Sequence, residues 1–274
     1  MKVTLHGQVT LFSNILTDIK IARECGYQAI ELHTDKLIRC LEAGVTAWQL
    51  KDVLDENDIE PAAIDIIGGI ETQLSQEKKY LFELTERLCE VASVIGAPTI
   101  QVNAFSELEG RPMEEVIGMT AENLQIIADI GLKKGIRFQI EGAAWTPIHT
   151  LEHCLELIKQ TDRNNVGLVI DFWHFWASRG ANPDDIRRLD ASLIYGVHLC
   201  DGLRPELGEP WPDERELRGC LPGEGDLPVR EWMDAVKTTG FEGFVSGEFL
   251  NHQLWERDLW DVSLEMRKRI ESYL

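Results

Sequence analysis

The sequence has few cysteines and no long apolar run, and both absences bear on where the protein works. Its six cysteines are widely spaced and form no C-x-x-C pair, which is typical of reduced thiols rather than of disulfides. The opening stretch MKVTLHGQVTLFSNILTDIK lacks the apolar core of a secretory signal, and no stretch approaches the length of a membrane span. We therefore expect a cytoplasmic protein without a membrane partner.

Positive charge is also scarce. The chain has 47 acidic and 27 basic residues, which gives a formal net charge of −20. Such a chain repels polyanions and offers no basic stripe for a phosphate backbone. Nucleic acid is therefore not an expected partner. The acidity itself is typical of solvated helix surfaces and says little about a small-molecule substrate.

No low-complexity linker divides the sequence. Its 274 residues suit one large barrel domain, and hydrophobic residues at 44% of the chain are enough for a substantial core. We expect a single domain over residues 1–274. The one long irregular segment runs from residue 204 to residue 226 and is rich in proline, glycine and charge. Loops of this length are often substrate-facing, and we expect this one to lie over the catalytic face.

A repeated unit indicates the fold. An amphipathic stretch, a glycine and a short apolar run ending in a polar residue recur in ECGYQAIELH, VIGAPTIQVN, KKGIRFQIEG and TTGFEGFVSGE. The glycines lie where the end of a helix favours a left-handed residue, and the apolar runs read as strands. This is the pattern of alternating helices and parallel strands.

The complete pattern gives eight strands and eight helices. The strands are predicted at 2–5, 29–33, 62–67, 99–103, 137–141, 166–171, 194–200 and 244–248. The helices are predicted near 14–25, 46–56, 73–95, 113–134, 150–160, 183–189, 229–238 and 255–273. We therefore predict an α/β fold, a (β/α)₈ TIM barrel. A doubly wound open sheet is the alternative, but no G-x-G-x-x-G follows a strand.

Acidic and imidazole side chains end the last four predicted strands. Glu141, Asp171, His198 and Glu248 each follow an apolar run, and none has an obvious basic partner nearby in sequence. In a barrel, the carboxyl ends of the strands meet around one axis, where catalytic groups lie. Singly, an acidic residue at a strand end is usually a helix cap or a solvated loop residue. Together, the four residues indicate one site.

A divalent cation would remove the repulsion among three carboxylates that face each other. One nitrogen and three oxygen ligands, without a thiolate, suit a hard or borderline ion. We therefore predict one metal ion bound by Glu141, Asp171, His198 and Glu248. Mn²⁺ is the first choice, with Mg²⁺, Co²⁺ and Zn²⁺ as alternatives.

These motifs resemble the xylose isomerase-like TIM barrel superfamily, which includes ketose 3-epimerases, hydroxypyruvate isomerase and inosose dehydratase. The resemblance covers essentially the whole chain. It rests on the opening helix followed by GYQAIELH, on IDFWH, and on a strand-seven histidine, His198, followed six residues later by Arg204. PGEGDLP resembles the glycine-flanked turn that precedes the seventh helix in that family.

By resemblance to the ketose epimerases, the metal-binding Glu141 and Glu248 would also exchange protons with the substrate carbon. The same resemblance implies that His174 and Arg204 hold substrate oxygens, although Arg204 could instead pair with acidic residues of its own loop. Endonuclease IV relatives use additional histidines and a basic groove, whereas this chain has seven histidines in all.

Other polar and aromatic residues near the strand ends are weaker candidates. His33 and Asn103 are expected substrate contacts, although each could equally be a structural hydrogen-bond partner. Trp145 and Trp173 lie near the metal motifs, and indole faces can pack against sugar rings.

Three functions follow from these residues. The first is a metal-dependent sugar isomerase or epimerase that removes a proton next to the carbonyl of a ketose or keto-polyol and passes through an enediolate. The second is a dehydratase or lyase, inosose dehydratase-like or glycoside-eliminating, that shares the first step. The third is a noncatalytic sugar-binding barrel or a subunit of a larger enzyme. A small carbohydrate is the expected partner in each, and homo-oligomer formation stays open.

Overall fold

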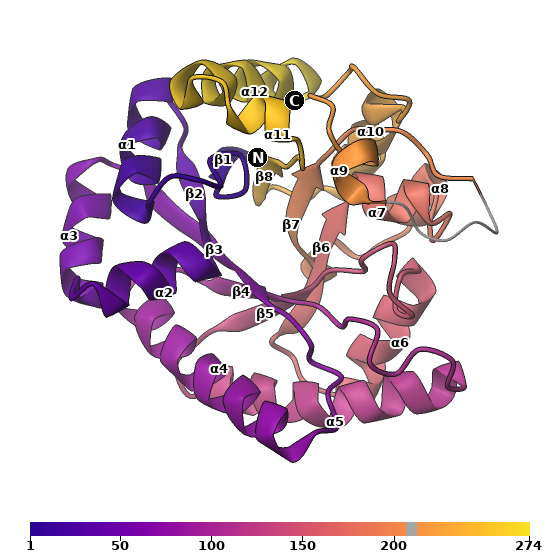
Figure 1. Cartoon of the computed structure of the whole chain (residues 1–274). Helices are drawn as coiled ribbons and strands as arrows, with labels where there is room; N and C mark the ends of the chain where they lie inside the picture. The colour runs from indigo at the N-terminus through magenta and orange to yellow at the C-terminus, as the bar shows by residue number, and fades with distance from the viewer. Residues whose placement is uncertain (207–212) are drawn as a thin grey trace.

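The computed structural model describes residues 1–206 and 213–274. Parallel strands close a barrel in the order β1 to β8, and helices surround it (Figure 1). The strands are β1 (Lys2–His6), β2 (Ala29–His33), β3 (Glu60–Ile67), β4 (Thr99–Val102), β5 (Arg137–Ile140), β6 (Val166–Asp171), β7 (Ile194–Leu199) and β8 (Phe244–Gly247). The predicted TIM barrel is confirmed.

The helices of the described residues follow the strands in alternation. They are α1 (Ile15–Cys25), α2 (Thr34–Glu42), α3 (Ala47–Glu56), α4 (Ser75–Ile95), α5 (Met113–Leu132), α6 (Leu151–Thr161), α7 (Phe172–Ala177), α8 (Pro183–Arg187), α9 (Glu214–Leu217), α10 (Val229–Thr239), α11 (His252–Trp255) and α12 (Leu259–Tyr273), with a short 3₁₀ turn, η1 (Ala191–Leu193). Within the parts of the chain that the structure covers, no helix combines the length and apolarity needed to cross a membrane.

The sequence pattern missed α2, α7, α9 and α11. The first two begin at the residue directly after β2 and β6, so no loop signal separates strand from helix. At α7 the start is fixed by Asp171, whose Oδ1 accepts a hydrogen bond of 2.8 Å from the amide of His174. Three of the four predicted glycine caps are present: Gly26, Gly96 and Gly240 end α1, α4 and α10 in the left-handed region, with φ of 79°, 87° and 81°. Gly135 is also left-handed, but the residue that caps α5 is Lys133.

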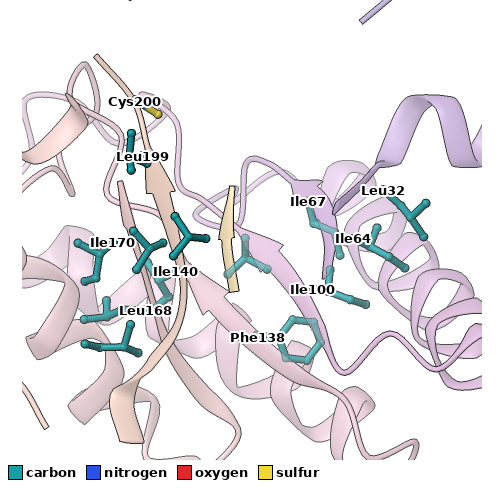
Figure 2. Close-up of a cluster of buried hydrophobic side chains, with 14 of the residues drawn as sticks. Leu32, Ile64, Ile67, Ile100, Phe138, Ile140, Leu168, Ile170, Leu199 and Cys200 are labelled. Carbon is teal, nitrogen blue, oxygen red and sulfur yellow. The ribbon is translucent and has the colours of Figure 1, made fainter. Parts of the chain in front are cut away.

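The strands are apolar because both of their faces are covered. Every residue of β6 and β7 is buried, as expected for parallel strands with side chains inside the barrel and helices outside. Figure 2 shows part of this core, where Ile64, Ile100 and Phe138 come from neighbouring strands. Strand register then aligns the polar strand ends: Asp171 pairs with His198, and His198 with Ser246.

A buried ion pair holds the loop between β1 and α1. Lys36 on α2 and Asp18 on α1 have fully buried side chains, and Lys36 Nζ lies 2.8 Å from Asp18 Oδ2. The same ammonium group donates to the carbonyl oxygens of Gly7 and Thr10, at 2.8 and 2.5 Å. The conformation of this loop is therefore fixed by the buried ammonium group of Lys36, which comes from α2.

Lys36→Met should lower the free energy of unfolding by about 3–5 kcal/mol, because it leaves the Asp18 carboxylate buried without its cation. Urea unfolding measures this change. The control is Lys51→Met, which removes an ion pair with Asp55 on an exposed helix face and should cost at most about 1 kcal/mol. A Lys36→Met loss no larger than that of the control would contradict the anchoring role.

Candidate metal centre

Four strand ends bring the predicted ligands together at one end of the barrel. Glu141 directly follows β5, Asp171 ends β6, His198 lies in β7 and Glu248 directly follows β8. One ligand atom from each of these residues lies within 4.8 Å of the others. Glu248 is the most exposed of the four, with 12% of its side-chain surface open to solvent. The strand-end pattern therefore describes a real cluster in space.

Two atoms of the cluster have the properties of open ligand positions. Glu141 Oε1 and His198 Nδ1 lie 3.5 Å apart, and both are buried without a hydrogen-bond partner. Buried polar atoms are normally satisfied, so a pair of unsatisfied acceptor-capable atoms facing each other fits a cation. The donor set of one imidazole and three carboxylates fits a divalent ion.

Glu31 supports His198 from the side opposite to the cluster. Its Oε2 lies 3.2 Å from His198 Nε2, and its other oxygen accepts a hydrogen bond from Ser246. Glu31 thus orients the imidazole so that Nδ1 faces the other ligands.

Arg218 lies among the ligands, which the sequence did not indicate. Its Nη2 donates to Asp171 and to Glu248, at 2.5 Å from Glu248 Oε2, and its side chain is almost fully buried. The expectation that these carboxylates lack a basic partner holds for the nearby sequence but is wrong in space, because Arg218 is 47 residues from Asp171. Although burial disfavours its charge, Asp171, Cys200 and Glu248 raise the pKa of Arg218 well above the usual value.

Arg218 compensates only part of the negative charge of the cluster. Glu141, Asp171 and Glu248 carry three formal negative charges, and Arg218 compensates one of them. Although burial disfavours their charge, Arg218 lowers the pKa of both Asp171 and Glu248, so these carboxylates stay ionised. The remaining imbalance matches a divalent ion in sign and size.

Arg204 lies away from this cluster. Its guanidinium stacks on Trp176, 4.2 Å from the ring centre, and donates a hydrogen bond of 2.7 Å to the Trp176 carbonyl oxygen. Over the described residues, no hydrogen bond or ion pair joins Arg204 to the four ligands or to an acidic residue of its own loop. The arginine that reaches the site is Arg218, which lies five residues before Gly223 of the predicted glycine-flanked turn.

His174 adjoins the cluster as expected. Its Nε2 lies 2.9 Å from Arg218 Nη1 and 3.9 Å from Glu141 Oε1. Trp173 is buried beneath these two side chains, and its indole nitrogen donates to the Leu203 carbonyl oxygen at 3.0 Å. Trp173 therefore supports Arg218 and His174 by packing and does not present an open face to a sugar.

The weaker candidates lie in three different settings. His33 precedes α2, and its pKa is lowered to about 4, chiefly by burial. Asn103 follows β4, and its side-chain oxygen is buried without a hydrogen-bond partner. Trp145 is 37% exposed and stacks on Phe105, with ring centres 5.6 Å apart. Of the three, Trp145 has an open aromatic face.

Two further polar residues of the mouth, Asp65 and Glu214, were not predicted, and His6, the last residue of β1, lies beside Asp65. His6 on β1 and Asp65 on β3 lie with Nε2 and Oδ2 3.6 Å apart, and both are buried. Burial, with Glu248 and Glu141 nearby, raises the pKa of Asp65 well above its usual value. Glu214 on α9 lies 3.9 Å from His174 Nδ1. Only the strand ends gave a sequence signal, and Glu214 lies instead on a short loop helix.

The loop after β7 is partly fixed by Asp201. Its carboxylate accepts hydrogen bonds from the amides of Gly223 and Gly225, at 2.8 and 2.9 Å. A side chain at position 225 would collide with Asp201 and Gly202, so the glycine is required there. The loop predicted over 204–226 therefore includes a fixed turn and α9, whereas its residues 207–212 lie outside the described residues.

Comparison with known proteins agrees with this architecture. The sequence model of the family described as xylose isomerase-like TIM barrel matches residues 19–270. Inosose isomerase of Halalkalibacterium halodurans is 25% identical over 260 residues, which are 93% of this chain and 90% of that protein. 3-Dehydroshikimate dehydratase of Pseudomonas aeruginosa is 27% identical over 174 residues, which are 62% of this chain but 26% of that protein.

Solved structures show the same fold. The crystal structure of the IOLI protein with a bound zinc atom has a TM-score of 0.91 and 22% identity, and the alignment covers 100% of this chain and 98% of that one. D-psicose 3-epimerase of Clostridium cellulolyticum, solved with D-tagatose, has a TM-score of 0.74 and 16% identity over 100% of this chain and 98% of that one.

Proposed function

Because the chain belongs to the xylose isomerase-like TIM barrel family, we propose that it is a divalent-metal-dependent isomerase or epimerase of a ketose or keto-polyol. The observation that carries the proposal is the buried cluster of Glu141, Asp171, His198 and Glu248, in which two facing ligand atoms lack hydrogen-bond partners. The inosose isomerase relative, similar over 90% of its length, supports a cyclic keto-polyol as the substrate class.

The four cluster residues would hold the ion. Mn²⁺ is our first candidate, since three oxygens and one nitrogen form a hard ligand set. When bound, the ion supplies Lewis acidity, which makes a proton next to a carbonyl easier to remove. Zinc is the alternative, supported by the zinc atom of the IOLI structure.

The proposed proton transfer uses the two glutamates of the cluster. Glu141 and Glu248 reach the centre from β5 and β8, which are not neighbouring strands, so they can approach a bound substrate from different directions. One carboxylate would accept the proton and the other return one. Arg218 and His174 would hold substrate oxygens, because they present adjacent nitrogen atoms next to the ligands.

A dehydratase is the second candidate. It is supported by the 3-dehydroshikimate dehydratase relatives, although the chain spans only about a quarter of the Pseudomonas protein. Both candidates begin with loss of a proton next to a carbonyl. They differ in the next step, because a dehydratase expels a hydroxyl group where an isomerase regains a proton.

Solvent deuterium exchange tests the proposal. Enzyme loaded with Mn²⁺ should exchange a carbon-bound proton of an inosose or of D-psicose for deuterium, and removal of the ion with a chelator should abolish the exchange until Mn²⁺ is restored. Proton NMR follows both exchange and product. Release of water with an ultraviolet-absorbing product would favour the dehydratase, whereas full exchange in a metal-free enzyme would contradict both candidates.

A further inference from the structure

An open cavity of about 490 Å³ with aromatic walls lies beside the metal centre, and of its lining residues Glu214 reaches toward that centre. Loops after β1, β5, β7 and β8 supply its lining, so it lies at the catalytic mouth of the barrel. Ligand clefts commonly have volumes of about 300–1,000 Å³, so this open space has room for a ring.

The aromatic walls are held in place although they face solvent. Phe12 is 65% exposed, and its ring makes an edge contact with Trp255 at 5.6 Å. Trp255 is fixed in turn by a hydrogen bond of 2.9 Å from its indole nitrogen to the Gln8 carbonyl oxygen. On another wall, Trp145 is stacked on Phe105. Rings that are exposed and held in place by other rings favour contact with an apolar ligand over contact with water.

Glu214 connects this cavity to the reacting centre. It lines the cavity, and its two oxygens lie 3.9 Å from His174 Nδ1 and 3.8 Å from Arg218 Nη1. Its Oε1 is buried and has no hydrogen-bond partner. A hydroxyl group of a ligand that crosses from the centre into the cavity would satisfy this oxygen.

We propose that this cavity binds a ring attached to the reacting keto sugar, so that the substrate is an aryl glycoside whose sugar carries its carbonyl at a carbon other than the glycosidic one, or a similar ring-bearing keto-sugar conjugate, rather than a free monosaccharide. The inference rests on the proposed function, because it takes the reacting sugar to lie at the metal centre. The attached ring would pack on Phe12 and Trp145, and Glu214 would accept a hydrogen bond from a sugar hydroxyl near the junction.

Calorimetric titration of the Mn²⁺-loaded enzyme tests the inference with two non-reacting probes, phenyl β-D-glucopyranoside and methyl β-D-glucopyranoside. The phenyl compound should bind at least about tenfold more tightly, which corresponds to about 1.4 kcal/mol. Phe12→Ala and Trp145→Ala should each remove about three- to tenfold of that advantage and leave the methyl compound's affinity within about twofold.

Trp48→Ala is the matched control, because Trp48 is as exposed as Phe12 but lies on α3, outside the cavity lining. It should change neither affinity. Equal wild-type affinities, no saturable binding of either probe, or a phenyl advantage that survives Phe12→Ala/Trp145→Ala would overturn the inference. Deuterium exchange by the wild-type enzyme from the same preparation tests the proposed function separately, because that experiment uses a keto sugar without an attached ring.

Discussion

Glu141→Gln or Glu248→Gln should reduce turnover by about 10² to 10⁴-fold, the contribution that general acid/base catalysis commonly makes. Glutamine keeps the size of the side chain and one metal-binding oxygen but cannot accept the proton, so substrate binding should weaken far less than turnover. The measurements are turnover and deuterium exchange, with the metal content of each variant determined in parallel because both residues are proposed ligands.

Glu60→Gln is the control for this pair. Glu60 begins β3, so it lies at the amino end of the strand, away from the mouth, and 65% of its side chain is exposed. This variant should keep full activity. If metal-replete Glu141→Gln and Glu248→Gln both keep near-normal exchange, the two-glutamate mechanism is wrong. His174 is then the better candidate base, because the Asp201 oxygens already accept backbone amides.

Arg218→Lys should lower kcat/KM by about 10² to 10³-fold, the loss expected when one charged donor is removed from a reacting centre. Lysine keeps the charge but cannot reach Asp171, Glu248 and His174 with a planar fork of donors. Metal content and thermal unfolding should be measured alongside, to separate loss of substrate binding from loss of the site's structure.

Arg204→Ala gives the comparison for this experiment. The Arg204 guanidinium stacks on Trp176 and donates to its carbonyl oxygen, away from the cluster, so we expect kcat/KM to change by less than about threefold. A larger loss in Arg204→Ala than in Arg218→Lys would restore the role that family resemblance implied for Arg204 and reject the one inferred from the structure.

The residues of the strand-end cluster could be located from the sequence because of a general property of parallel barrels. A short apolar run fixes a strand, and the residue at its carboxyl end must face the common mouth. Glu141, Asp171, His198 and Glu248 were therefore placed together without any knowledge of the loops. The longer helices were predicted where a loop precedes them, whereas α2 and α7, which begin directly after a strand, were missed.

Arg218 could not be located in this way. It follows α9, in a loop that has no hydrophobic periodicity from which its path could be predicted. Its partners Glu248 and Asp171 lie 30 and 47 residues away in the sequence. The family resemblance, which includes an arginine six residues after the strand-seven histidine, implied Arg204 instead. The helix α9 lies between these two arginines and directly precedes Arg218, which reaches the centre, whereas Arg204 stacks on Trp176.

The buried Lys36 makes the conformation of the β1 loop independent of the side chains that the loop presents at the mouth of the barrel. Lys36 fixes the main chain of the β1 loop through carbonyl oxygens, so the loop's shape does not depend on which side chain stands at position 12. Phe12 could then be exchanged during evolution or engineering while the proposed proton-transfer residues, which directly follow β5 and β8, remain unchanged. One barrel could in this manner acquire a different substrate range through a single loop position.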